Sequence, residues 1–311
     1  MTKLWLDTDI GTDCDDSVCL AYLLAQRDCA LLGISTVGMA SSERAAIVEV
    51  ICRQFGRDDI PIVAGADRPL FETPYWTGHH LHQASVLERW PASRTYPPNR
   101  ALPLMREAIE ANPGEVVMLT IGPLSNLALL AAAEPELVQQ LAGVWSMGGY
   151  FTDPADPPQA ECNIMLDPVA AGIAFQHQLP DHRLLSLNYT RGKRLDRDQV
   201  RTCFGADAFA PVLECCDPAA GDKTKSGSGL HDPLTAAAIF HPQWFQWRRG
   251  HIGCHLYDHD LRHGHKLADD KVTGATWFKP DQAGPHQLVT DGDAQVAIDH
   301  IIKTVRPVGP R

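Results

Sequence analysis

Short apolar runs alternate with helix-length segments along most of this chain, and this alternation limits its possible folds more than any other feature. The runs typical of buried strands are Lys3–Leu6, Ala30–Val37, Ile60–Ala64, Glu115–Ile121, Ala142–Met147 and Leu184–Leu187. The helix-length segments are Asp16–Gln26, Ser42–Phe55, Leu102–Asn112, the stretch after Gly122, and Leu234–Phe240. Strands that alternate with helices form parallel sheets, because each helix carries the chain back across the sheet. We therefore predict an α/β fold with one open, mostly parallel, Rossmann-like sheet and helices on both faces.

Nothing in the sequence divides the chain into separate units. No linker, internal repeat or low-complexity tract is apparent, and 311 residues suit one large α/β domain. We therefore expect residues 1–311 to form a single domain. The His- and Gly-rich stretch Gly250–Gly284 is predicted to contain edge strands and loops.

Composition excludes several classes of partner. The formal net charge of -11 argues against binding to nucleic acid or to anionic membranes, because both require positive surface. No apolar run approaches the roughly 18 residues of a membrane-spanning helix, and no signal-peptide pattern precedes the first strand. The nine cysteines include no CxxC pair, which predicts reduced thiols in a cytoplasmic protein rather than a disulfide framework or a zinc site.

Acidic residues are concentrated directly after the first strand. The stretch WLDTDIGTDCDDSVCLAYLL, beginning at Trp5, contains Asp7, Asp9, Asp13, Asp15 and Asp16. The first two follow the strand, at the edge of a parallel sheet where ligand sites form, and the last two open the next helix. The helix dipole offsets only a fraction of this charge, and a hard cation such as Ca²⁺ or Mg²⁺ would offset the rest. The alternative is a solvated acidic loop.

Two familiar carboxylate templates do not fit this stretch. An EF-hand loop starting at Asp7 requires Gly at the position of Thr12 and Glu at the position of Val18. A phosphatase of the haloacid-dehalogenase type requires a Thr two residues after its second Asp, but Ile10-Gly11 follows Asp9. Its late acidic pair would come from TDGDAQVAID, where the spacing is wrong.

A third template fits at four places along the chain. The DxDxG…DD arrangement resembles the N-terminal signature of the calcium-dependent nucleoside hydrolases, the inosine–uridine-preferring N-ribohydrolases. Three further segments resemble the same family, in the same order: MLTIGPLSNLALL (Met118–Leu130), SMGGYF…QAECNIMLDPVAA (Ser146–Ala171) and GLHDPLTAAA (Gly229–Ala238). Four matches in order, within a resemblance running from Lys3 to Val305, make the nucleoside hydrolase fold the expected one.

The resemblance implies hydrolysis of the N-glycosidic bond of ribonucleosides, with Ca²⁺ as cofactor and a small nucleoside as substrate. The implied metal ligands are Asp9, Asp16, the main-chain carbonyl of Ile121, and Asp232. Asp9 would also be the general base, acting on a Ca²⁺-bound water, and His231 is the candidate acid for the leaving base, with a structural histidine as the alternative. The implied substrate contacts are Asp15, Met147, Glu161, Asn163 and Asp232. The family resemblance further implies a homodimer or homotetramer.

Two stretches depart from the family pattern at the sugar site. The second strand usually leads into a Gly-Asn or Gly-Asp pair, but Met39 and Ala40 stand here. The family often places an Asn for the 5′-hydroxyl before the position of Glu161, and TDPADPPQAE has none. This segment offers instead Asp153, Ala155 and Asp156. A related enzyme for a modified or deoxy nucleoside therefore remains an alternative, as does a non-catalytic nucleoside-binding protein.

The segment YWTGHHLHQASVLERW stands where the family usually has a His-Gly loop. Its histidines, His79, His80 and His82, are candidates for contact with the base, together with Trp76 and Trp90. A transition-metal site is the alternative for the three histidines. Base preference depends on the segments least like the family, so it stays open. Asn126 is predicted to be a turn residue that satisfies backbone groups.

Overall fold

A computed structural model describes residues 1–72, 80–151, 159–206, 209–216, 227–256, 259–260, 265–266 and 273–306 of the chain. Its central feature is a nine-stranded sheet with the order β12-β9-β13-β6-β5-β4-β1-β2-β3. The strands are β1 (Thr2–Thr8), β2 (Cys29–Thr36), β3 (Ile62–Ala64), β4 (Val116–Thr120), β5 (Gly143–Met147), β6 (His182–Leu185), β9 (Phe245–Cys254), β12 (Thr276–Pro280) and β13 (His286–Gly292). All neighbours from β3 to β13 are parallel, whereas β9 is antiparallel to both β13 and β12. The predicted open, mostly parallel sheet is confirmed.

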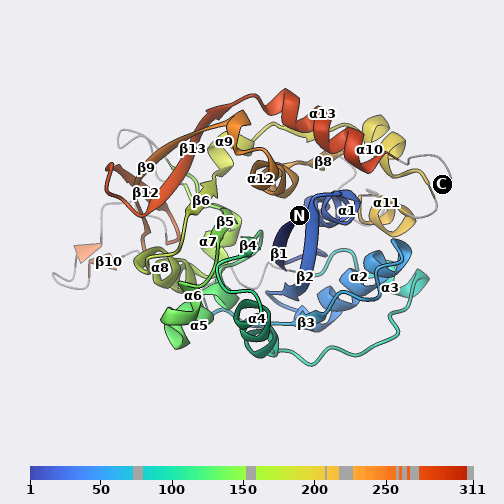
Figure 1. Ribbon diagram of the computed structural model, residues 1–311, viewed down its shortest axis with the longest axis horizontal. Coiled ribbons are helices and arrows are strands. Elements are labelled where there is room, and N and C mark those ends of the chain that lie inside the picture. Colours follow the sequence, from blue (N-terminus) through green and yellow to red (C-terminus); the bar gives the residue numbers. More distant parts are fainter. Residues whose placement is uncertain are drawn as a thin grey trace.

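Helices cover both faces of this sheet, as predicted (Figure 1). One side carries α1 (Asp15–Ala25), α2 (Ser41–Gln54), α10 (Arg197–Phe204), α11 (Ala210–Cys215), α12 (His231–Phe240) and α13 (Ala294–Val305). The other carries α4 (Ala101–Glu110), α5 (Ser125–Ala133), α6 (Pro135–Val138) and α8 (Pro168–Gln176). Within the described part of the chain, no helix is both long and apolar enough to cross a bilayer.

Shorter elements connect these layers. The short helices are α3 (Ser85–Arg89), α7 (Cys162–Leu166), α9 (Leu187–Thr190) and the 3-10 turn η4 (Pro242–Trp244). Two small ribbons pair β7 (Arg194–Leu195) with β8 (Ser228–Gly229), and β10 (His259–Asp260) with β11 (His265–Lys266).

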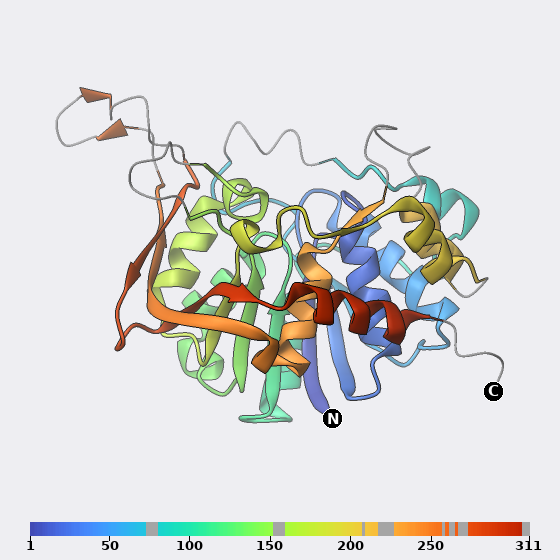
Figure 2. The same ribbon diagram turned by 90° about the horizontal axis from the view of Figure 1, so that it is seen from above.

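The pattern of apolar residues explains why the helices lie where they do. In α4, Ala101, Met105 and Ile109 are buried at helical spacing, and they pack into the apolar cluster on their side of the sheet. In α13, Ala297, Ile298, Ile301 and Val305 do the same on the opposite side. Packed from both sides, β1 is buried along most of its length. The strand that leads to the acidic stretch therefore lies in the centre of the molecule (Figure 2).

Three sequence assignments needed correction. Strand β9 begins at Phe245, before the stretch Gly250–Gly284 that was predicted to hold edge strands, and of the two strands only β12 lies at the edge, because β9 pairs with both β12 and β13. Strand β13, which was not predicted, adds to the parallel part beside β6; its mixed sequence HQLVTDG gives no clear strand signal. The predicted strand Leu184–Leu187 ends early, because Leu187 begins α9.

The order of the strands fixes where a ligand can bind. From β1 the chain builds outward to β2 and β3, and it then returns to place β4 on the other side of β1. At such a reversal the connections from neighbouring strands leave in opposite directions, which opens a crevice at the carboxyl ends of the strands. In this protein the reversal falls between β1 and β4, so a crevice is expected at the carboxyl ends of these two strands.

Candidate active site

Asp9 lies at this crevice, one residue beyond the end of β1. Its carboxylate approaches the turn between β4 and α5 so closely that a Cβ on Gly122 would lie 2.9 Å from Asp9 Oδ1. Only glycine allows this approach. Asp9 as a whole residue is 7% exposed and therefore buried.

Three further carboxylates meet in the same region. Asp15 and Asp16 occupy the first turn of α1, and Asp232 occupies the first turn of α12. Because α1 packs against α12, one carboxylate oxygen from each of the three residues lies within 4.8 Å of the others, and all three are buried. The Thr8 hydroxyl donates a hydrogen bond of 2.5 Å to Asp16 Oδ1. Residues from distant parts of the sequence thus form one acidic cluster.

Burial and mutual repulsion disfavour the charged forms of these carboxylates. Burial, followed by the charges of Asp9 and Asp15, raises the pKa of Asp16 well above its usual value. Burial and then Asp15 and Asp16 do the same to the pKa of Asp232, and burial raises the pKa of Asp15 to about 7. Buried like charges of this kind are stabilised by a cation with oxygen ligands, so the residues present fit a hard divalent ion. The acidic cluster comprises Asp9, Asp15, Asp16 and Asp232, and three of these residues, Asp15, Asp16 and Asp232, form a group that could hold a metal ion.

Glu161 and Asn163 close the crevice on the side of β5. Glu161 precedes α7, and its carboxylate accepts hydrogen bonds from the backbone N–H groups of Gly149 (3.0 Å), Asn163 (2.9 Å) and Ile164 (3.3 Å). Burial raises the pKa of Glu161, and these three donors act in the opposite direction. The Asn163 amide donates to the carbonyls of Ile121 (2.9 Å) and Met147 (3.2 Å). The carbonyl of Ile121 therefore has a protein partner on one of its two lone pairs.

His231 is held in one orientation by Thr190. Its Nδ1 lies 2.8 Å from Thr190 Oγ1, and this hydroxyl donates to the carbonyl of Ser186 at 3.2 Å. The hydroxyl must then accept from His231 Nδ1–H, which assigns the tautomer. A Cβ on Gly229 would lie 3.0 Å from His231 Nε2 and 3.8 Å from Asp15 Oδ2, so Nε2 is on the side of the acidic cluster. Burial lowers the pKa of His231.

The predicted base-contacting histidines are only partly described. His80 and His82 lie with ring centroids 6.2 Å apart. Their segment is hydrogen-bonded to the acidic loop, which is residues 9–14 between β1 and α1. The Thr12 hydroxyl donates to the carbonyl of His80 at 3.3 Å, and Gln83 N–H donates to the carbonyl of Gly11 at 3.0 Å. Five other sequence candidates fall outside the described residues: His79, Trp76, Asp153, Ala155 and Asp156.

Two residues near the site, Asp7 and Asn126, form hydrogen bonds that connect strands and loops of the sheet. Asp7 is fully buried and accepts hydrogen bonds from Ser35 Oγ (2.5 Å) and Asn126 Nδ2 (2.7 Å). Asn126 also donates to the carbonyl of Thr36 and accepts from Ala66 N–H, so it does satisfy backbone groups. It does so from the first turn of α5, however, and the prediction of a turn residue is wrong on that point. The fully buried Arg44, which no sequence argument singled out, contacts the acidic loop from α2.

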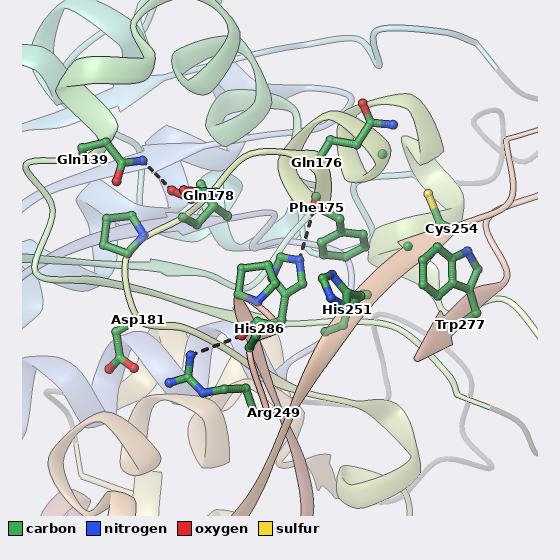
Figure 3. Close-up of a pocket in the computed structure, with 18 of the residues that line it drawn as sticks. Gln139, Phe175, Gln176, Gln178, Asp181, Arg249, His251, Cys254, Trp277 and His286 are labelled. Carbon is green, nitrogen blue, oxygen red and sulfur yellow. Dashed lines mark hydrogen bonds between the residues drawn. The ribbon is translucent and has the colours of Figure 1, made fainter. Parts of the chain in front are cut away.

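A separate cavity of about 900 Å³ lies between α8 and the edge strands β9 and β12 (Figure 3). Phe175, His251, Cys254, Trp277 and His286 line it. Among the described residues that line this cavity, Asp181 is the only acid, and it accepts hydrogen bonds from Gln287 (2.6 Å) and Arg183. The cavity thus offers no group of carboxylates comparable with the acidic cluster.

Comparison with known proteins agrees with this geometry. The family model described as inosine-uridine preferring nucleoside hydrolase matches residues 4–299. The chain belongs to that family. The predicted family is therefore confirmed, and so is the predicted class of enzyme, because nucleoside hydrolases are hydrolases of the N-glycosidase type.

Similar proteins in this nucleoside hydrolase family carry names that state different base preferences. The pyrimidine-specific ribonucleoside hydrolase RihA of Shewanella baltica is 30% identical, over 92% of this chain and 94% of that protein. Uridine nucleosidase 1 of Arabidopsis thaliana is 27% identical, over 86% of this chain and 82% of that protein. A purine-preferring ribonucleoside hydrolase from Gardnerella vaginalis has the same fold, with a TM-score of 0.80 at 19% identity over 98% of each chain. Base preference thus varies while the fold is retained.

Proposed function

We propose that this protein hydrolyses the N-glycosidic bond of ribonucleosides, releasing the free base and ribose. The observation that carries this proposal is the meeting of three buried carboxylates, Asp15, Asp16 and Asp232, within 4.8 Å at the crevice. Membership of the nucleoside hydrolase family supports the reaction class. An acidic cluster at the end of β1 suits a substrate with several hydroxyls, because each hydroxyl donates to a carboxylate.

We propose Ca²⁺ as the cofactor, held by the carboxylates of Asp9, Asp16 and Asp232 and by the carbonyl of Ile121. These donors are all oxygen, which is the ligand type that Ca²⁺ prefers. When bound, this ion would lower the pKa of a water molecule and neutralise part of the cluster. Mg²⁺ uses the same donor type, so the identity of the ion is part of the proposal.

The remaining roles follow from the chemistry of bond cleavage. The sugar develops positive charge as the base departs, which the surrounding carboxylates stabilise. Asp9 would take a proton from the attacking water. His231 would act in its imidazolium form, in which Nδ1–H still donates to Thr190 and Nε2–H gives its proton to the leaving base. The residues proposed to hold the ribose are Asp15, Asp232, Glu161 and Asn163, with Met147 packed beside the sugar. His79, His80 and His82 are the proposed contacts to the base.

We further propose that residues 1–311 form one domain that assembles into a homodimer or homotetramer in the cytoplasm. The continuous sheet from β3 to β12 supports a single domain, and the free cysteines suit a reducing compartment. Absence of binding to nucleic acid or membrane remains a prediction from the charge of -11.

The decisive experiment measures free reducing sugar released from a panel of nucleosides, with and without EDTA. Release of ribose from natural ribonucleosides that EDTA abolishes and Ca²⁺ restores would support the proposal. Release only from deoxy or modified nucleosides would instead favour the alternative raised by Met39 and Ala155. Binding of a nucleoside without turnover, measured by calorimetry, would indicate a non-catalytic binding protein and contradict the proposal.

A further inference from the structure

Arg44 is a fully buried arginine on the side of α2 that faces the acidic loop. Its Nε donates to the carbonyl of Met39 at 2.7 Å, in the loop between β2 and α2. Its Nη1 donates to the carbonyl of Ile10 at 3.0 Å, to Thr12 Oγ1 at 2.9 Å and to the carbonyl of Asp9. One guanidinium therefore connects two loops at the carboxyl edge of the sheet.

The geometry of these bonds requires arginine. A guanidinium is planar and presents donors in a fixed fork, so Nε and Nη1 can reach two loops at once. Lysine has one nitrogen on a flexible stem and cannot reproduce both sets of bonds. The three acceptors of Nη1 all belong to the stretch from Asp9 to Thr12, which carries the proposed base.

The positive charge of Arg44 also interacts with the carboxylates of the acidic cluster. Asp9 and Asp16 are the first two acids whose charges act on its guanidinium, and Arg44 in turn opposes the rise in the pKa of Asp16. Within the described part of the chain, Nη2 of this buried side chain finds no hydrogen-bond partner. Burial of an arginine is costly, and an apolar residue would serve better if Arg44 acted only in packing.

We propose that Arg44 is a positioning residue that fixes the backbone of Asp9, and thereby aims the Asp9 carboxylate at the proposed metal and water site. This inference rests on the proposed function. The Thr12 hydroxyl extends the same arrangement, because it accepts from Arg44 and donates to the carbonyl of His80. Arg44 therefore contacts the acidic loop directly and reaches the His80 segment through Thr12, beside the bond from Gln83 N–H to the carbonyl of Gly11.

The test compares Arg44→Lys with Arg53→Lys as the matched control. Arg53 lies on the same helix, but its guanidinium contacts Glu49 and the carbonyl of Pro91, away from the cluster. We expect R44K to lower kcat about 100-fold with little change in KM, since a misplaced group costs about that much. R53K is expected to retain the kcat and KM of the wild-type protein.

A second readout does not depend on turnover. Terbium(III) replaces Ca²⁺ in oxygen sites, and its luminescence lifetimes in H₂O and D₂O give the number of bound water molecules. If Asp9 loses its position as a ligand, water fills the vacant place, so R44K is expected to gain about one terbium-bound water. A purely structural role would lower the melting temperature and leave this number unchanged.

The outcomes separate this inference from the proposed function. An R44K protein with the kcat and the terbium-bound water count of the wild type would overturn the role of Arg44. If the wild type binds terbium but releases no ribose, the proposed function fails and the water count still decides the role of Arg44. If the wild type does not bind terbium, both proposals are overturned.

Should R44K fail to fold, Thr12→Val provides a second test, because it removes a single acceptor of the Arg44 guanidinium. We expect T12V to lower kcat about tenfold, and an unchanged kcat would contradict the inference.

Discussion

Two aspartates only two positions apart have different surroundings, and this difference is set residue by residue. Asp7 is part of β1 and is held by Ser35 and Asn126, whereas Asp9 lies beyond the strand against Gly122. The first carboxylate satisfies donors inside the sheet. The second is directed at the crevice, where we propose that it acts as the base.

The two alanine variants should therefore affect different properties, turnover in one case and stability in the other. Asp9→Ala is expected to lower kcat by roughly a thousandfold or more while the protein stays folded, because the base and a proposed ligand are lost. Asp7→Ala is expected to lower the free energy of unfolding by about 2–5 kcal/mol, because the Ser35 hydroxyl and the Asn126 amide lose their acceptor. Steady-state kinetics and urea unfolding measure the two effects. Near-normal turnover in D9A would show that the base assignment is wrong.

Thr190 controls His231 in a way that can be tested separately. Thr190→Val keeps the shape of the side chain and removes the oxygen that accepts from His231 Nδ1–H. We expect kcat to fall about tenfold for natural nucleosides, whose base leaves more readily when protonated. For p-nitrophenyl riboside, whose leaving group needs no proton, kcat should change less than twofold. Equal losses on both substrates would mean that His231 has a structural role only.

At the scale of elements, a chain of polar side chains crosses four adjacent strands of the sheet. Thr120 on β4 donates to Ser146 on β5 at 2.8 Å, and Ser146 Oγ lies 3.3 Å from His182 Nε2 on β6. His182 Nδ1 lies 2.8 Å from His286 Nδ1 on β13, and His286 Nε2 bonds the carbonyl of Phe175 at 3.1 Å. Because a carbonyl only accepts, His286 carries its proton on Nε2, and His182 donates from Nδ1. Both imidazoles are therefore neutral in this arrangement.

The histidine pair should make the protein sensitive to acid. Burial lowers the pKa of His286 to about 4 and that of His182 well below its usual value. As the pH falls from about 6.5 to 4, the unfolded chain binds protons that the folded chain does not, so the free energy of unfolding decreases. For His286 alone the loss amounts to about 3 kcal/mol.

His286→Gln should flatten this dependence. Urea unfolding between pH 4 and 6.5, with EDTA present, gives the slope for each protein, and the difference between variant and wild type isolates the histidine. His177→Gln, at the end of α8, is the control that removes a half-buried histidine outside the pair. An unchanged slope in H286Q would show that His286 does not resist protonation in the folded protein.

For the whole molecule, the acidic cluster joins parts of the chain that are far apart in sequence. Asp16 opens α1, Asp232 opens α12, and these two helices pack against each other and against α13. An ion bound between them would stabilise the contact between the first and last parts of the fold. Without a cation, the same carboxylates repel one another.

Calcium is therefore expected to raise the melting temperature. At 100 times its dissociation constant, a ligand that binds only the folded state adds about 2.7 kcal/mol, which corresponds to a few degrees for a chain of this size. The proposed ligands Asp16 and Asp232 have raised pKa values and must lose their protons to bind the ion, so the affinity should increase as the pH rises. Calorimetry with Ca²⁺ and EDTA tests this, and Asp232→Asn should abolish the shift. A melting temperature that is independent of Ca²⁺ in the wild type would contradict the proposed site.

The sequence by itself determined the alternation of strands and helices, the family and the candidate acids, because apolar periodicity and local motifs are written in consecutive residues. It did not reveal β13, the bond between Asp7 and Asn126, or Arg44, because these depend on partners from other elements. A buried arginine in SSERAAIVEV looks like any polar residue of an amphipathic helix until the fold places it beneath the carbonyls of Asp9 and Ile10. Long-range contacts decide which charges meet, and only the tertiary structure contains them.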